Sequence, residues 1–141
     1  MTLDAQRLEM IRANAQLVVA QLGPLSEMVF GYDQASVAWV EGFIERQRDN
    51  PESDESGKAR LGSVIACYVG EAIIAATGGA WDETENGALG VRFANGNWCF
   101  PFAKVSKQLE SGLEAGESVL SFYNVSVTVL ARGESTLQDE T

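Results

Sequence analysis

Two Asn-Gly pairs, at 86–87 and 95–96, constrain the fold of this chain more than any other feature of its sequence. An Asn-Gly pair between short extended segments favours a type I′ turn, because both residues tolerate a positive φ. The two pairs therefore predict a three-stranded antiparallel meander with strands over 80–84, 88–93 and 97–100. Apolar side chains alternate along these segments, so one face of the sheet needs a covering layer of helices.

Helical periodicity precedes the meander. Apolar residues recur every three or four positions in three segments, which predicts helices over 3–22, 34–48 and 58–77. Gly23 and Pro24 should end the first helix, because proline cannot continue an α-helix and glycine favours its left-handed terminal conformation. In the third helix the small residues Gly62, Ala66 and Gly70 lie four apart and let a neighbouring element approach closely.

Two further segments follow the meander. Pro101 suits the first turn of a helix over 101–111, which Gly112 should end. The segment 118–131 fits a strand by the propensity of its valines and a helix by its spacing, and we interpret it as a helix. The chain is thus expected to be an α+β protein with one domain over 1–132 and a polar tail over 133–141.

The net charge of the chain limits the kinds of partner that it is expected to bind. Among 141 residues there are 20 acidic and 10 basic side chains, which gives a net charge of −10. Nucleic acids and anionic membranes attract basic surfaces, so neither is an expected partner, whereas a basic protein is. We also expect no membrane-spanning segment of roughly 20 apolar residues and no N-terminal secretory signal, which together indicate a cytoplasmic protein.

The chain contains no histidine. Catalytic sites that pair serine or cysteine with histidine, and metal sites with histidine ligands, therefore do not apply to this sequence. Cys67 and Cys99 are far apart and belong to no Cys-x-x-Cys motif, so we expect buried free thiols. No cofactor motif, metal site or set of catalytic residues is predicted.

Aromatic and acidic residues around the first predicted hairpin form the candidate recognition surface: Trp81, Asp82, Glu83 and Glu85. Aromatic side chains ringed by polar ones often dominate protein interfaces. Glu71 should lie at the margin of the third helix's apolar face, where a carboxylate needs a partner. Arg92 or Lys104 could supply that partner, and the pair of Glu71 with Arg92 is the candidate buried ion pair.

Residues 61–125 carry a pattern of a helix ending in Gly-Glu, then Gly-Gly-x-Trp, an Asn-Gly hairpin, an aromatic-Pro pair and a further helix. The positions concerned are Gly70, Glu71, Gly78, Gly79, Trp81, Phe100, Pro101, Lys107 and Gly112. This block resembles a group of small bacterial domains of unknown function, which are similar to immunity proteins encoded beside toxins. The resemblance implies an α+β fold with a C-terminal helix, and it implies no enzymatic activity.

Three functional hypotheses follow. The first is a non-enzymatic, acidic protein-binding module, such as an immunity protein that neutralises a bacterial toxin. The second is a small-molecule-binding or enzymatic domain with a pocket between sheet and helices, in which Glu71 and Arg92 are the polar groups. The third is a self-assembling domain that associates through its first helix.

Overall fold

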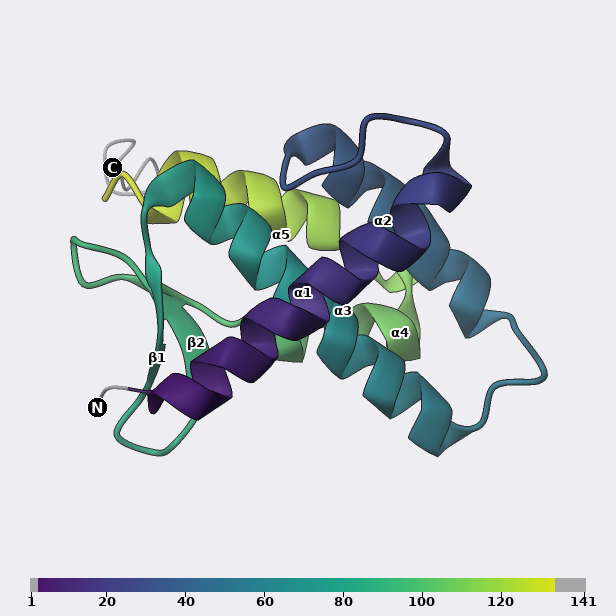
Figure 1. Ribbon diagram of the computed structural model, residues 1–141, viewed down its shortest axis with the longest axis horizontal. Helices are drawn as coiled ribbons and strands as arrows, with labels where there is room; N and C mark the ends of the chain where they lie inside the picture. Colours follow the sequence, from purple (N-terminus) through teal and green to yellow (C-terminus); the bar gives the residue numbers. More distant parts are fainter. Residues whose placement is uncertain (1–2, 134–141) are drawn as a thin grey trace.

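The computed structural model describes residues 3–133, so the tail expected over 133–141 lies almost wholly outside the described residues. Helix α3 (Glu55–Thr77) runs through the centre of the molecule, and α1 (Ala5–Ser26) crosses it in front like the second arm of an X (Figure 1). Helix α4 (Pro101–Ser111) packs on α3 from the other side, and α2 (Gln34–Arg48) contacts α4 and α5 (Val119–Val125). The expected α+β fold is confirmed.

Local capping explains where α2 and α3 begin. Asp33 accepts a hydrogen bond from the Ser36 amide at 2.8 Å, and Asp54 accepts one from the Gly57 amide at 2.7 Å. Aspartate at this position satisfies amides that the helix itself leaves unbonded. Helix α3 therefore begins at Glu55, three residues earlier than expected, and ends at Gly78 in the left-handed conformation.

The expected end of the first helix is wrong. Helix α1 contains Pro24 and continues to Ser26, and the left-handed residue that ends it is Glu27. The additional turn is held by two contacts. The Ser26 hydroxyl donates to the Gly23 carbonyl at 2.7 Å, and the Phe30 side chain packs against the backbone of Gly23. A proline this near the end of a helix disturbs only its last turn.

Strands β1 (Ala80–Glu83), β2 (Leu89–Arg92) and β3 (Trp98–Cys99) form the expected antiparallel meander in the order β1-β2-β3. Both turns differ from the expected type I′. Each is a three-residue loop, over 85–87 and 94–96, in which only the glycine has a positive φ. In each loop a side chain accepts the amide that follows the glycine: Thr84 Oγ1 from Ala88, and Asn95 Oδ1 from Asn97.

The C-terminal segment is helical, as expected, but it changes geometry part-way. Helix α5 is followed without a break by one π-helical stretch, η2 (Ser126–Leu130), and a short 3₁₀ turn, η1 (Leu113–Ala115), precedes it. The end of η2 is fixed by the second hairpin, because the side-chain amides of Asn95 and Asn97 donate to the Leu130 carbonyl at 2.8 and 2.9 Å.

Within residues 3–133, α3 is the one helix long and apolar enough to cross a membrane by length and composition. The expectation that no segment has this character is therefore wrong. Half of its apolar window is buried against other elements of the same chain. Its small residues have the expected role: Gly62 faces Leu109 of α4, and Gly70 faces the ring of Trp81.

Candidate functional site

Trp81 lies in the core rather than on the surface. Its side chain is 6% exposed, and a Cβ atom added to Gly70 would lie 2.1 Å from its ring. The indole nitrogen donates to Glu71 Oε2 at 2.8 Å. The prediction that Trp81 contacts a partner is therefore wrong, because β1 turns this side chain inward against α3.

The expected ion pair between Glu71 and Arg92 is also wrong. Glu71 bonds to Trp81 on the inner side of the sheet, whereas Arg92 points outward and pairs with Asp82, with Nη1 3.6 Å from Oδ2. The Glu71 carboxylate still acts on its surroundings. Burial is the main cause of the raised pKa of both Tyr32 and Cys67, and the negative charge of Glu71 raises both further.

One change in turn length accounts for both errors. A two-residue turn at 86–87 would pair Trp81 with Arg92, whereas the three-residue loop pairs Trp81 with Val91 and Asp82 with Gly90. Side chains alternate between the two faces of a strand, so a shift of one residue moves every side chain to the opposite face. The loop thus places Trp81 inside and Asp82 outside.

The outer face of the sheet carries a hollow of about 410 Å³ beside the first hairpin. We call it the hairpin hollow, and it is lined by Asp82, Glu83, Thr84, Glu85, Asn86, Arg92 and Trp98. Three of the four residues predicted to bind a partner therefore meet in one depression. Arg7 of α1 pairs with Glu83, which ties this part of the hairpin to the first helix.

Trp98 is the residue that the sequence analysis missed. The predicted alternation placed it beside the buried side chains, but β3 pairs it with Arg92 on the outer face. Its ring is parallel to that of Phe100, with centroids 5.9 Å apart, and Phe100 in turn covers Gly90. The hairpin hollow therefore combines a half-buried, rigidly stacked indole with carboxylates at its rim.

A larger depression lies between the N-terminal half of α3 and α4. This α3–α4 groove has a volume of about 580 Å³ and is lined by Arg48, Glu55, Lys58, Ala59, Gly62, Ser63, Phe102, Ser106, Leu109 and Glu110. Lys58 donates to the Arg48 carbonyl at 3.2 Å, and the Arg48 guanidinium packs on the backbone of Gly112. Neither the hairpin hollow nor this groove is lined by Glu71.

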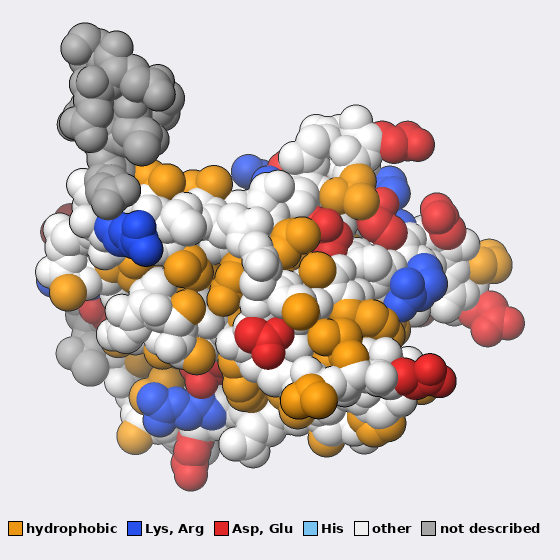
Figure 2. Space-filling view, turned by 90° about the horizontal axis from the view of Figure 1, so that it is seen from above, with side chains coloured by type: hydrophobic (Ala, Val, Ile, Leu, Met, Phe, Trp, Pro, Cys, Tyr) orange, Lys and Arg blue, Asp and Glu red, His pale blue; other side chains and the backbone are white. Residues whose placement is uncertain are grey.

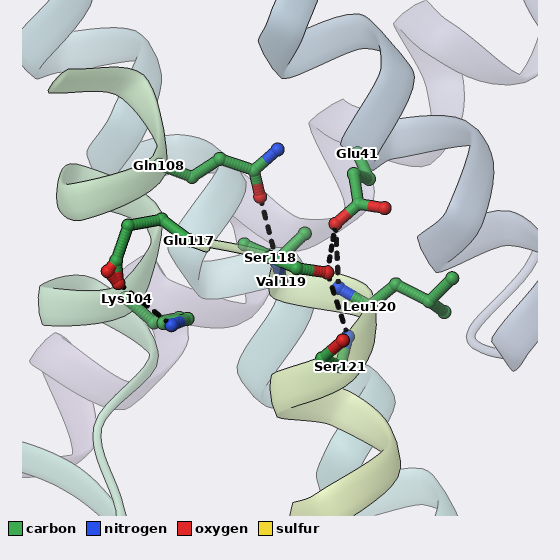
Figure 3. Close-up of polar contacts among 8 residues, drawn as sticks. All are labelled: Glu41, Lys104, Gln108, Glu117, Ser118, Val119, Leu120 and Ser121. Atoms are coloured by element: carbon green, nitrogen blue, oxygen red, sulfur yellow. Dashed lines mark hydrogen bonds and ion pairs between the residues drawn. The ribbon is translucent and has the colours of Figure 1, made fainter. Parts of the chain in front are cut away.

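A cluster of polar side chains surrounds the start of α5 (Figure 3). Glu41 of α2 accepts hydrogen bonds from the Ser118 hydroxyl and, at 3.3 Å, from the Leu120 amide. Gln108 of α4 accepts from the Val119 amide at 2.8 Å. These groups are occupied with one another and with the first amides of α5, so the cluster stabilises a helix end and offers no reactive side chain.

Charge is unevenly spread over the surface. Hydrophobic side chains occupy much of the face seen in Figure 2, and acidic ones are most numerous towards its right-hand end, where Figure 1 shows the connection from α2 to α3. The exposed acids of that segment are Asp49, Glu52, Asp54 and Glu55. Among the described residues no group of three or more His, Cys, Asp or Glu is placed to hold a metal ion.

Comparison of the chain with family models, curated proteins and solved structures found no match. The hairpin hollow and the α3–α4 groove are therefore interpreted from their own residues.

Proposed function

We propose that this chain is a non-enzymatic binding module for a basic protein, and that the hairpin hollow is its recognition site. The observation that carries the proposal is the meeting of Asp82, Glu83 and Glu85 with the indole of Trp98 in one depression. A lysine or arginine side chain can stack on an indole while it pairs with carboxylates, and such anchors dominate many interfaces. The net charge of −10 supports the proposal, since it attracts a basic partner over long range.

The resemblance of residues 61–125 to immunity-type domains suggests which partner to test first. Immunity proteins act by occluding a toxin, and a basic toxin encoded by a neighbouring gene has the charge that this surface requires. We propose a cytoplasmic location for the complex on the same basis. Neither nucleic acid nor a membrane belongs to this proposal, because both favour basic surfaces.

Quantitative co-purification from the native host tests the proposal. The wild-type chain should retain a basic protein in stoichiometric amount, and Glu85→Lys or Trp98→Ala should retain at least about tenfold less. Glu52→Lys is the matched control, because it makes the same change in charge on an exposed residue at the other end of the molecule. Absence of a stoichiometric partner, or equal losses for Glu85→Lys and Glu52→Lys, would contradict the proposal.

A defined ligand gives a second measurement. Tetra-arginine should perturb the indole NMR signal of Trp98, and the effect should weaken as salt is raised, because screening reduces attraction between exposed charges. The indole of Trp81 should change little, since it is buried and bonded to Glu71. Equal perturbation of both indoles would point to a general effect of the peptide.

Binding of a small polar molecule is a second candidate function, and the α3–α4 groove favours it. Its volume lies in the range of ligand sites, and its charged lining consists of two cations, Arg48 and Lys58, and two carboxylates, Glu55 and Glu110. The sequence analysis placed this function in a pocket with Glu71 and Arg92 as its polar groups. That location is not supported, because Trp81 fills the space beside Glu71. A metabolite that raises the melting temperature of the wild type, but not of Lys58→Gln, would support the groove.

A further inference from the structure

We infer that the α3–α4 groove binds a free α-amino acid with a large apolar side chain. This assignment rests on the second candidate function, the binding of a small polar molecule, and names the class of that molecule. It is independent of the proposed binding of a basic protein, because the α3–α4 groove and the hairpin hollow share no lining residue.

The groove has two charges of each sign, Arg48 and Lys58 against Glu55 and Glu110. Within the described residues no ion pair joins either cation to either carboxylate. Arg48 pairs instead with Glu45, which does not line the groove. A simple anion would meet the two carboxylates, and a simple cation would meet the two cations. A ligand that carries both charges, and is neutral as a whole, is complementary to all four groups.

Each of these charged groups keeps hydrogen-bonding capacity for a ligand. The one ion pair of Arg48, from Nη1 to Glu45 Oε1, is 3.4 Å long and leaves other N–H groups of the guanidinium. Lys58 uses one ammonium hydrogen in its 3.2 Å bond to the Arg48 carbonyl. Among the described residues no side chain donates a hydrogen bond to Glu55 or Glu110. The cations are thus suited to bind a carboxylate, and the carboxylates an ammonium group.

The order of contacts along the groove shows that α3 and α4 run antiparallel. Gly62 of α3 faces Leu109, near the end of α4. Farther along α3, Gly70 faces the ring of Trp81. The same ring has its centroid 5.8 Å from that of Phe102, near the start of α4. Phe102 therefore lies at one end of the groove.

The four charged residues lie at the other end. Glu55 and Lys58 precede Gly62 on α3, and Glu110 directly follows Leu109 on α4. Arg48 joins them through the bond that its carbonyl accepts from Lys58. The groove is thus charged at one end, with both signs together, and aromatic at the other.

An α-amino acid has the same division. Its ammonium and carboxylate groups are attached to one carbon atom, and its side chain extends away from both. The rise along α4 from Phe102 to Glu110 is about 12 Å, so a small side chain would not reach from the charged end to the Phe102 ring. A large apolar side chain would pass over Gly62, which leaves room because it has no side chain of its own. An aromatic side chain would also pack on the ring of Phe102.

Isothermal titration calorimetry of the full chain with L-phenylalanine and three analogues tests the inference. Phenethylamine lacks the carboxylate, N-acetyl-phenylalanine lacks the ammonium group, and glycine lacks the side chain. We expect L-phenylalanine to bind and each analogue to bind at least about tenfold more weakly, because a site built for a polar group rejects a molecule without it.

Two variants assign the two charges of the ligand. Lys58→Gln should weaken the binding of phenylalanine at least about fivefold without weakening that of phenethylamine, which has no carboxylate. Glu110→Gln should weaken phenylalanine without weakening N-acetyl-phenylalanine. Lys107→Gln and Glu114→Gln are the matched controls, because both are exposed residues that do not line the groove. Circular dichroism of each variant checks that it folds.

Absence of phenylalanine binding up to about 10 mM would overturn the inference. So would an analogue of one charge that binds as tightly as phenylalanine, or equal losses for Lys58→Gln and Lys107→Gln. The second candidate function would survive the first two results if another metabolite stabilised the wild type but not Lys58→Gln. If no small molecule did so, that function would fail together with the inference.

Discussion

At Gly70 the central helix packs directly against a side chain of the sheet. The ring of Trp81 occupies the place of a side chain at this position, with 2.1 Å between the ring and an added Cβ atom. Alanine improves helix propensity by about 1 kcal/mol, but a rigid indole cannot move aside without disturbing its bond to Glu71. Gly70→Ala should therefore lower the free energy of unfolding by about 1–3 kcal/mol, measured by urea denaturation.

Gly62→Ala is the internal control for that measurement. Its nearest neighbour would be a terminal methyl carbon of Leu109 at 2.9 Å, which a rotation of a flexible side chain can relieve. The gain in helix propensity then offsets most of the cost, and the change should stay within about 1 kcal/mol. If Gly70→Ala and Gly62→Ala were equally destabilising, the packing of Trp81 on α3 would not be the reason for glycine at position 70.

The buried thiol of Cys99 makes the stability of the folded protein depend on pH in the alkaline range. Burial raises the pKa of its thiol from 9.0 to about 11, and the nearby Ser126 hydroxyl limits the rise. The folded protein thus holds the thiol proton more tightly than the unfolded chain does. The resulting stabilisation is complete below pH 9 and is lost as the pH rises towards 11.

Between pH 8 and pH 10.5 this thiol alone should reduce the free energy of unfolding by about 2 kcal/mol. Cys99→Ser should make the decline less steep, without abolishing it, because Cys67 and the three tyrosines Tyr32, Tyr68 and Tyr123 also have raised pKa values. Urea denaturation at a series of pH values measures the two slopes. Identical slopes for the wild type and Cys99→Ser would contradict the assignment.

Among the elements, the hairpins show what the sequence can and cannot predict. The two Asn-Gly pairs predict the position and order of the strands correctly, because any short antiparallel connection needs a residue with positive φ near its middle. They do not decide between two-residue and three-residue loops. That choice depends on Thr84 and Asn95, whose side chains accept an amide in the loop, and it determines which face each strand residue occupies.

The unknown loop length also limits how much of the candidate site the sequence predicts. Asp82, Glu83 and Glu85 were identified as the acids around the first hairpin, which needs no knowledge of the register, whereas Trp81 and Trp98 exchange faces when the register shifts by one residue. Trp98 can be assigned to the outer face only when the longer loop is known, because that loop pairs it with Arg92.

Helix α5 is the element most dependent on side chains from elsewhere. Its first amides are bonded to Glu41 of α2 and Gln108 of α4 (Figure 3). The Gln108 side chain is fully buried and also donates to Glu45 at 2.9 Å. No spacing within 118–131 reveals this support, which explains why the segment was ambiguous between helix and strand. The polar contacts, together with packing on α2, favour the helix.

Gln108→Leu should therefore destabilise the protein by roughly 2–3 kcal/mol. Leucine fills much of the same volume, but it leaves the buried Val119 amide without an acceptor, and an unsatisfied buried donor is costly. Gln108→Glu keeps the acceptor and is the matched variant, although it places a second carboxylate beside Glu45. Thermal unfolding followed by circular dichroism compares them, and a loss below about 0.5 kcal/mol for Gln108→Leu would show that α5 does not need this bond.

At the scale of the whole molecule, the candidate binding surfaces differ in the charges of the residues that line them. The hairpin hollow has three carboxylates and one cation in its lining, whereas the α3–α4 groove has two of each. The hollow is connected to α1 through the pair between Arg7 and Glu83. A basic protein and a small molecule would thus use different surfaces of one chain, and substitutions in the hollow or in the groove distinguish them.

The same charge balance sets how salt acts on stability. With a net charge of −10, self-repulsion within the folded protein should exceed the attraction of its few ion pairs at low ionic strength. An increase from about 10 mM to 300 mM NaCl should then raise the melting temperature by roughly 3 °C, which corresponds to about 1 kcal/mol for a domain of this size. The double variant Asp49→Lys and Glu52→Lys changes the net charge from −10 to −6 in an exposed loop, so its increment should be clearly smaller. A melting temperature that stayed constant or fell with salt would mean that ion pairs such as Arg7–Glu83 and Lys104–Glu117 outweigh the repulsion among the acids.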